Sequence, residues 1–194
     1  MPRVTDAYRR ARRDEIASAA FRCLRRKGVS GTSIADVVAE SGLSAGAIYS
    51  HFRNKAELAA YIAGSMMTWR IEEFEESTDP ALATPAGGMR YLLGVFEQPD
   101  VTPEVILQFW GEATNDPDLH AVMAGVIGRM RAAFASAIRP WALERAGAEG
   151  AEGLAARTAS VMVALCQGYI ANAALFGLRS VDDYLADAAA ALDA

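Results

Sequence analysis

The apolar residues of this 194-residue chain recur at intervals of three and four positions, the spacing of amphipathic helices, and no segment alternates like a strand. Ile34, Val37 and Val38 share one face of a short predicted helix. A longer predicted helix before it ends near Gly28, and its apolar stripe comprises Ile16, Ala20, Cys23 and Leu24. Capping side chains followed by proline or by an acidic residue predict five more helix starts, at Asn54, Thr84, Thr102, Asp116 and Ser180. The sequence therefore predicts an all-α fold of about nine helices.

The segment 32–52 predicts two short helices joined by a sharp turn. Ser33 can cap the first helix, and Asp36, three residues later, can complete a capping box. Gly42 supplies the positive φ that the end of a helix usually needs, and Ser44 can cap the next helix. Two short helices around a glycine-containing turn are typical of a helix-turn-helix, whose second helix enters the major groove of DNA. We therefore expect this segment to bind DNA.

The second of these helices has an outer face of small side chains. Ile48 and Phe52 fall on its other side and point back toward the first helix. The outward positions are Ala45, Gly46, Ala47 and Ser50. A face this flat can press against the edges of bases in a major groove.

These motifs resemble the DNA-binding domain of the TetR (tetracycline repressor-like) regulators. The resemblance is ungapped from about Ile16 to Leu58 and includes the runs TSIADV, SGLS and IYSHFRNKAEL. It implies an all-helical homodimer in which residues 1–53 form the helix-turn-helix domain. Residues 54–194 would then form a larger helical domain for ligand binding and dimerisation.

The resemblance also implies roles for individual residues of the DNA-binding set. Positions that match phosphate contacts in the family are Thr32, Ser33, Tyr49, His51 and Lys55. Positions that face bases are Ala45, Gly46, Ala47 and Ser50, and the capping Ser44 completes the set. Many members carry lysine where this chain has Ala45, so one contact common in the family is missing.

Charge is divided unevenly along the chain, whose net charge is −5. Residues 1–55 contain eleven Lys and Arg against five Asp and Glu, and residues 56–194 contain eight against nineteen. Double-stranded DNA should therefore meet the first part, because counterion release attracts a basic surface and an acidic one is repelled. The densest basic run comprises Arg9, Arg10, Arg12 and Arg13. Such a run alone is more often a solvated terminus, but beside a helix-turn-helix we interpret it as a DNA contact.

No charged residue occurs between Arg157 and Arg179, a span long enough to cross a bilayer. We expect no membrane segment, because Ser160, Gln167 and Asn172 interrupt the span and alanine is frequent in it. A helix that is apolar on all sides is expected to pack against a second subunit as well as against the core of its own subunit. The alternative is a helix buried entirely within the core of one chain. The resemblance implies that this helix and the last one form a four-helix bundle with their symmetry mates. The expected dimer interface comprises Val161, Leu165, Tyr169, Asn172 and Tyr184.

The expected function is that of a repressor released from DNA by a small-molecule effector. A single helix-turn-helix contacts too few bases to select an operator, whereas a twofold dimer presents two recognition helices about 34 Å apart. A ligand that changes this separation lowers affinity for the near-palindromic site. The alternatives are regulation of the same domain by a protein partner, and activation instead of repression.

An apolar or amphipathic ligand is expected because the C-terminal part is rich in large apolar side chains, although most such residues are simply core. The candidate lining residues are Trp69, Phe109, Trp110, Met123, Met130, Phe134 and Gln167. Gln108 and Glu112 are among the few polar side chains expected to converge on the same pocket.

Catalysis, cofactor binding and metal binding are not expected. The sequence has no glycine-rich phosphate loop, no cysteine–histidine metal spacing and no Gly-x-Ser-x-Gly elbow, and His51 and His120 fall in different predicted domains. Cys23 and Cys166 lie on apolar faces of separate predicted domains, so we expect inert core thiols rather than a disulfide. The arginine-rich N-terminus lacks the apolar core of a signal peptide, and the expected location is the cytoplasm.

Overall fold

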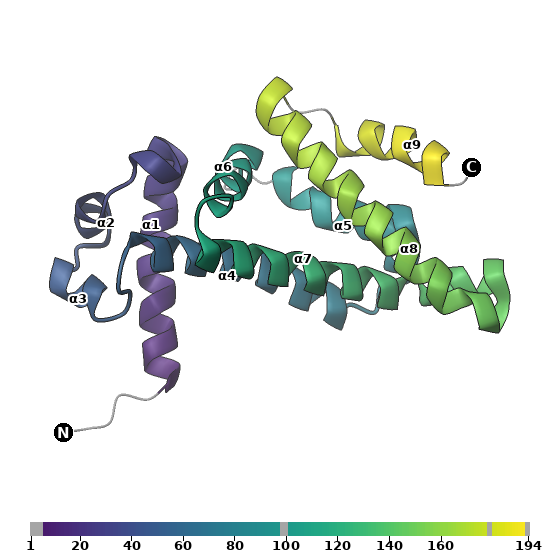
Figure 1. Cartoon of the computed structure of the whole chain (residues 1–194), viewed down its shortest axis with the longest axis horizontal. Coiled ribbons are helices and arrows are strands. Elements are labelled where there is room, and N and C mark those ends of the chain that lie inside the picture. Colours follow the sequence, from purple (N-terminus) through teal and green to yellow (C-terminus); the bar gives the residue numbers. More distant parts are fainter. Residues whose placement is uncertain (1–5, 98–100, 178–179, 193–194) are drawn as a thin grey trace. The chain divides into compact units, whose positions relative to one another are not determined.

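The computed structural model describes residues 6–97, 101–177 and 180–192. These residues form nine α-helices and two short 3-10 helices without any strand, which confirms the predicted all-α fold (Figure 1). The α-helices are α1 (Asp6–Gly31), α2 (Ile34–Ser41), α3 (Ala45–Tyr49), α4 (Lys55–Glu76), α5 (Pro85–Leu93), α6 (Pro103–Ala113), α7 (Pro117–Ala137), α8 (Arg139–Phe176) and α9 (Val181–Leu192). The 3-10 helices are η1 (Pro80–Ala83) and η2 (Gly94–Glu97).

The predicted helix starts are confirmed, and side-chain caps account for most of them. Asn54 Oδ1 accepts a hydrogen bond from the backbone N–H of Glu57 at 2.7 Å in the first turn of α4. Thr84, Asp116 and Ser180 accept in the same way from first-turn N–H groups of α5, α7 and α9, at 2.9 to 3.3 Å. Helix α6 also begins at the proline that follows its expected cap. These starts are predictable because cap and donor lie within four residues of each other.

Helix α1 ends later than the sequence predicts, and no start is predicted for α8. Helix α1 continues to Gly31 across a kink at Gly28, where φ is 75°. Helix α8 begins at Arg139, directly after α7, and is 38 residues long with a kink at Gly147. Ile138 occupies the N-cap position of α8, where its fully buried side chain makes no capping hydrogen bond. The apolar spacing continues through this break, and the local signal for it is Pro140 in the first turn of α8.

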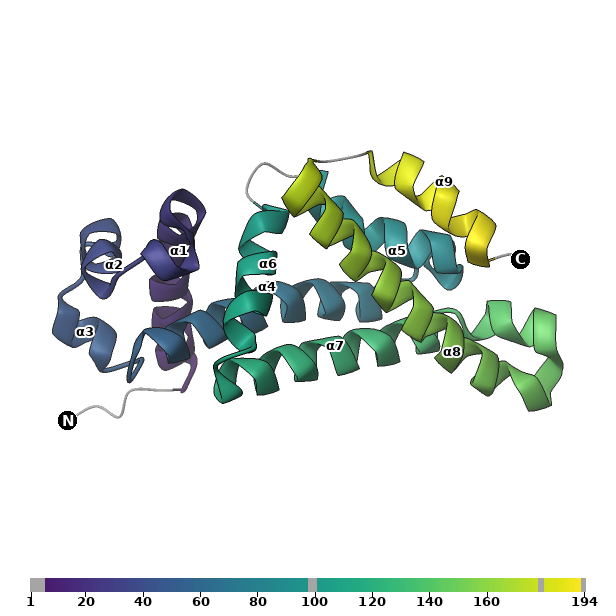
Figure 2. The same ribbon diagram turned by 45° about the horizontal axis from the view of Figure 1, so that its top comes forward.

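The described residues divide into two compact units. The first has the bounds Met1–Met66 and Gln108–Met123, and the second Met67–Leu107 and Ala124–Ala194. In the first unit, α2 lies beside α1 in both views (Figures 1 and 2), and Ile16, Ile48 and Phe52 are at most 1% exposed. The expected boundary after residue 53 falls inside this unit, just before α4, and as a limit of the DNA-binding domain it stays a prediction.

The second unit is built around α5, α8 and α9, which pack against one another (Figures 1 and 2). Met89, Leu93, Phe134 and Met162 are at most 1% exposed and form the centre of its core. Burial of large apolar side chains at this density is the main source of stability for such a helical unit.

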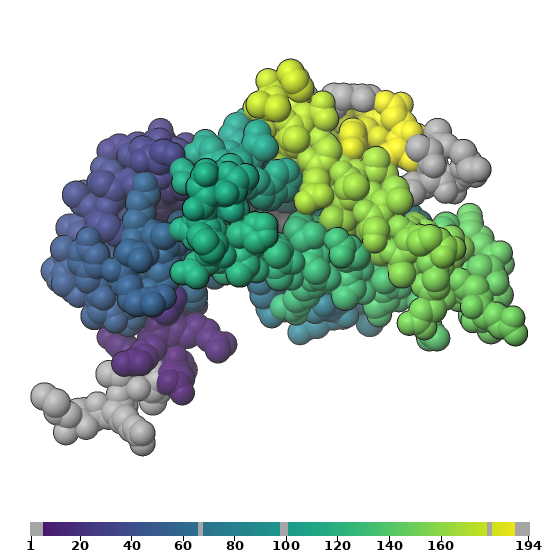
Figure 3. Space-filling model, in the orientation of Figure 1, coloured from purple at the N-terminus to yellow at the C-terminus, as the bar shows by residue number. Residues whose placement is uncertain are grey.

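Helix α8 is the one helix of the described residues that is long and apolar enough to cross a bilayer. Length and composition do not separate such a helix from a core helix, and Met162 and Cys166 are fully buried against the rest of the second unit. Its other face is open, with Val161 47% and Leu175 62% exposed, and the yellow-green surface of α8 is uncovered in Figure 3. Within one chain, α8 is therefore buried on one face only. Residues 178 and 179, at the end of the charge-free span, lie outside the described residues.

Candidate nucleic-acid interface

A complete capping box begins α2, as predicted. Ser33 Oγ accepts a hydrogen bond from the Asp36 N–H at 3.2 Å, and Asp36 Oδ2 accepts from the Ser33 N–H at 2.8 Å. Lys27 Nζ, near the end of α1, also donates to Asp36 Oδ1. These hydrogen bonds, from Lys27 and then from Ser33, hold the pKa of Asp36 well below its usual range. Asp36 is therefore ionised at neutral pH, and its carboxylate ties α2 to α1.

The turn between α2 and α3 depends on Gly42. This residue has φ 70° and ψ 6°, a left-handed conformation that other residues rarely adopt, and its N–H donates to Val38 O at 3.0 Å. Ser44 then caps α3, since its Oγ accepts from the Ala47 N–H at 3.1 Å. The predicted helix-turn-helix is thus present, and local side chains and one glycine fix its angle.

Helix α3 presents the small outer face that the sequence predicts. Ile48 and Phe52 are 0% and 1% exposed and point into the core of the first unit. On the outer side, Ala45, Gly46 and Ser50 are exposed and Ala47 is half-buried. The Ser50 hydroxyl donates to Ala47 O at 2.7 Å, so its oxygen keeps acceptor capacity for a base edge.

The expected phosphate contacts differ in how free their side chains are. Tyr49 is 53% exposed and His51 is half-buried, so both side chains can contact the phosphate backbone of a DNA duplex that runs along α3. Thr32 is only 5% exposed, and its Oγ1 donates to Gly28 O at 2.8 Å. Its hydroxyl is therefore engaged within the protein and is not a free donor for phosphate.

The last turn of α1, after the kink at Gly28, is held by α6. The Val29 N–H donates to Gln108 Oε1 at 2.7 Å, and Ser30 Oγ donates to Glu112 Oε1 at 2.7 Å. Gly28 leaves room for this contact, because a Cβ there would lie 2.8 Å from Gln108 Oε1. Gln108 and Glu112 thus support the helix-turn-helix instead of converging on a pocket, which corrects the sequence-based expectation. The bond to Val29 spans 79 residues, and no local pattern signals it.

The expected ligand-lining residues are divided between the two units. Phe109, Trp110 and Met123 belong to the first, and Trp69, Met130, Phe134 and Gln167 to the second. Phe109 and Phe134 are 2% and 1% exposed, as core residues are, whereas Trp69 is 53% exposed. A shared ligand site for these residues stays a prediction.

A surface groove of about 510 Å³ lies within the second unit. The end of α4, η1 and the last turns of α7 line it, with Phe74, Leu82 and Ala133 as its apolar part. None of the expected ligand-lining residues borders this groove.

The expected dimer residues lie on α8 and α9, but they are not all at the surface. Val161 is 47% exposed and Asn172 is exposed, whereas Leu165 is half-buried. Tyr184 donates its hydroxyl to Leu165 O at 2.6 Å and is itself half-buried. Tyr169 is 3% exposed, with its ring centre 5.1 Å from that of Tyr184, so it supports the surface from inside, contrary to the expectation.

The dimer interface expected from the sequence omits two exposed apolar residues of α8, because they come after Asn172, its last residue on this helix. Leu175 is 62% exposed and Phe176 is 81% exposed. Leu175 lies fourteen residues after Val161, four helical turns along the same face. Extending the helical period to the end of the charge-free span would have found it.

The cysteines are buried in different units, as expected for core thiols. Cys23 is 1% and Cys166 is 0% exposed. Burial raises the pKa of both thiols, to about 12 for Cys166, so both are protonated at neutral pH and are poor nucleophiles. Among the described residues, no cluster of His, Cys, Asp or Glu could hold a metal ion.

The sequence and the fold both resemble known proteins. The profile of bacterial regulatory proteins of the tetR family matches residues 16–62, and the profile of the C-terminal part of BetI-type transcriptional repressors matches residues 88–194. The regulator TtgR of Pseudomonas putida is 37% identical over 98 residues, which are 48% of this chain and 44% of that protein. The regulator AcrR of Shigella flexneri is 33% identical over 73 residues, 38% of this chain and 31% of that protein. The matched region thus spans less than half the length of these relatives.

Solved structures share the whole fold at low sequence identity. A TetR transcription regulator from Haloarcula marismortui superimposes with a TM-score of 0.79 at 18% identity, covering 95% of this chain and 97% of that one. A TetR-family regulator from Mesorhizobium loti gives 0.72 at 20% identity, covering 95% of each chain. At this identity the likeness shows a common fold and no more.

Proposed function

Because the chain belongs to the TetR family of bacterial regulatory proteins, we propose that it is a repressor that binds a near-palindromic DNA site as a homodimer and leaves it when a small ligand binds. The family and the matched relatives are transcriptional regulators, which are not enzymes. Such a protein acts in the cytoplasm, where the DNA is.

The observation that carries the proposal is the flat face of α3. Ala45, Gly46 and Ser50 are exposed on a helix that Ile48 anchors in the core, so the backbone of α3 can approach base edges closely. The excess of basic residues in the first 55 positions supports the same orientation, since it favours contact of this part with the DNA backbone.

Dimerisation is supported by the open face of α8. Val161, Leu175 and Phe176 expose apolar side chains on one helix, and such exposure is favourable mainly where another protein surface covers it. A twofold dimer would place two copies of α3 about one turn of duplex apart. Release requires a ligand that binds within residues 54–194 and changes this separation. An apolar or amphipathic compound suits the aromatic and methionine side chains of that part of the chain.

Selection of bound sites from random DNA duplexes tests the proposal. We expect a near-palindrome with half-site centres about 34 Å apart. Apolar and amphipathic compounds are then added to the complex with the selected duplex, and at least one class should release the DNA. A single unpaired half-site would contradict the homodimer, and DNA that stays bound throughout would favour regulation by a protein partner.

Replacing Lys55 with alanine should lower the salt dependence of DNA binding. Lys55 Nζ donates to Ser30 O at 3.1 Å, which fixes the ammonium beside the helix-turn-helix and leaves it further donors for a phosphate. We expect the slope of log affinity against log salt to fall by about one unit, with the preferred sequence unchanged. Arg131→Ala, which removes the same charge from an exposed site in the second unit, should leave the slope as it is. Equal slopes for wild type and Lys55→Ala would remove the phosphate assignment.

A further inference from the structure

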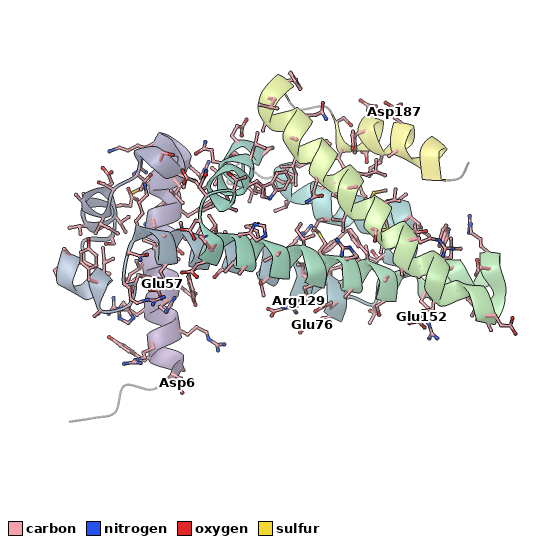
Figure 4. All side chains as sticks on the ribbon, in the orientation of Figure 1. Asp6, Glu57, Glu76, Arg129, Glu152 and Asp187 are labelled. Carbon is pink, nitrogen blue, oxygen red and sulfur yellow. The ribbon has the colours of Figure 1, made fainter. Side chains whose placement is uncertain are left out.

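A cation held between two aromatic rings joins α1 to the segment that follows α3. The guanidinium carbon of Arg13 lies 4.4 Å from the ring centre of Phe52 and 4.5 Å from that of Tyr61. Arg13 Nη2 also donates to Glu57 Oε1 at 3.4 Å, and Glu57 is labelled at the start of α4 in Figure 4. Arg13 therefore links three segments of the first unit: α1, the connection after α3, and α4.

The surroundings of Arg13 set it apart from its neighbours in the basic run. Its Nε is enclosed without a hydrogen-bond partner among the described residues, although its side chain as a whole is 29% exposed, close to the 31% of Arg12. Arg12 instead bonds within its own helix, to Glu15 Oε2 at 2.6 Å and to Tyr8 Oη at 3.3 Å. Of the four basic residues of this run, Arg13 is thus the one held against the rings of Phe52 and Tyr61.

The ring of Phe52 is coupled directly to the end of α3. The N–H groups of Phe52 and His51 both donate to Ile48 O, each at 3.0 Å. Ile48 belongs to α3 and is fully buried. A displacement of the Phe52 ring would consequently shift the last turn of α3 and with it the exposed side chains of Tyr49 and Ser50.

Tyr61 joins helix α4 to α1 and to the ring of Phe52. The Tyr61 hydroxyl donates to Asp14 Oδ1 at 2.6 Å, and its ring meets that of Phe52 edge-on with centres 5.4 Å apart. Arg13 and Asp14, adjacent on α1, are therefore both held by one aromatic residue of α4.

From this arrangement we infer that Arg13 is a positioning residue for DNA recognition, which sets the end of α3 through Phe52 and does not itself contact phosphate. The inference rests on the proposed DNA-binding function. Arginine is required because its planar guanidinium can stack on two rings at once, whereas the compact, strongly hydrated ammonium of lysine cannot.

The decisive variant is Arg13→Lys, which keeps the charge and removes the planar group. Binding is measured by fluorescence anisotropy, at several salt concentrations, to the duplex selected by the wild type and to a scrambled duplex of the same composition. We expect affinity for the selected duplex to fall about tenfold, because the stacking on two rings is lost. Affinity for the scrambled duplex and both salt slopes should stay unchanged, since these depend on charge alone.

Two pairs of variants separate positioning from other roles. Tyr61→Leu, which removes one ring at constant charge, should reproduce the loss of preference. Tyr61→Phe keeps the ring and loses only the hydrogen bond to Asp14, so it should retain most of the preference. Arg145→Lys, the matched control, removes a guanidinium that lies 4.5 Å from the ring centre of Trp141 on α8, and it should bind DNA like the wild type. Circular dichroism at the assay temperature establishes that each variant is folded, and if Arg13→Lys is not, the Tyr61 pair decides the question.

The outcomes distinguish this inference from the function on which it rests. Wild-type affinity in Arg13→Lys, or equal binding by the two Tyr61 variants, would overturn the positioning role. A third variant, Arg13→Gln, removes the charge as well as the planar group. If it lowers the salt slope and reduces affinity equally for both duplexes, Arg13 contacts phosphate instead. Absence of any preferred duplex for the wild type would contradict the proposed function itself.

Discussion

Ala45→Glu is expected to abolish specific DNA binding, with affinity for the selected duplex reduced at least about a hundredfold. Ala45 is exposed at the first position of α3, on the face proposed to meet base edges. A carboxylate at a helix N-terminus favours the helix, so the fold should be retained. The same carboxylate would lie against phosphates and bases, where its charge is repelled and its bulk prevents close approach. Fluorescence anisotropy with the selected duplex measures the effect.

Two further variants make this result specific to α3. Ala121→Glu adds the same charge at an exposed position of α7, and its affinity should stay within about twofold of the wild type. Ala45→Lys introduces the cation that many family members carry here, and it should raise affinity and steepen the salt slope by about one unit. Wild-type binding by Ala45→Glu would be incompatible with α3 as the recognition helix.

The double variant Val161→Asp with Leu175→Asp is expected to convert the proposed dimer into monomers. Both side chains are exposed within one chain, 47% and 62%, so the subunit fold should be unaffected. Covering two carboxylates with an apolar partner surface would leave them desolvated and unpaired, which costs several kcal/mol. Affinity for the palindromic duplex should then fall at least about a hundredfold, because the two half-sites are no longer bound by one linked pair of helices.

Sedimentation velocity at micromolar concentration measures the change in assembly. Leu143→Asp is the matched control, since Leu143 is 50% exposed on the same helix before the kink at Gly147. This variant should remain dimeric and bind DNA normally. A dimeric double variant would show that the C-terminal face of α8 is not the interface.

The parts of the site that could be read from the sequence are those made by neighbours in the chain. The Ser33 capping box, the left-handed Gly42 and the Ser44 cap were all predictable, because each joins residues at most four positions apart. The division of α3 into a buried side with Ile48 and an outer side of small residues follows from helical periodicity in the same way.

Contacts between distant segments could not be read this way. Arg13 looks like one more cation of a basic arm until Tyr61 is placed against it, 48 positions later in the chain. Gln108 looks like a polar lining residue until its amide oxygen meets the Val29 N–H. Tyr169 shares a helical stripe with Val161 and Leu165, yet it is buried because the rings of Phe96 and Tyr184 pack against it.

Local sequence patterns are thus sufficient to predict the helical fold, the helix-turn-helix and the exposed side of α3. Each depends on backbone propensity, capping and apolar period, which act over one or two helical turns. The packing of distant helices, by contrast, sets which polar and aromatic side chains support that motif and which face of α8 stays open. Those outcomes depend on which distant helices meet and on which surfaces they leave uncovered, and neither is encoded in the spacing of neighbouring residues.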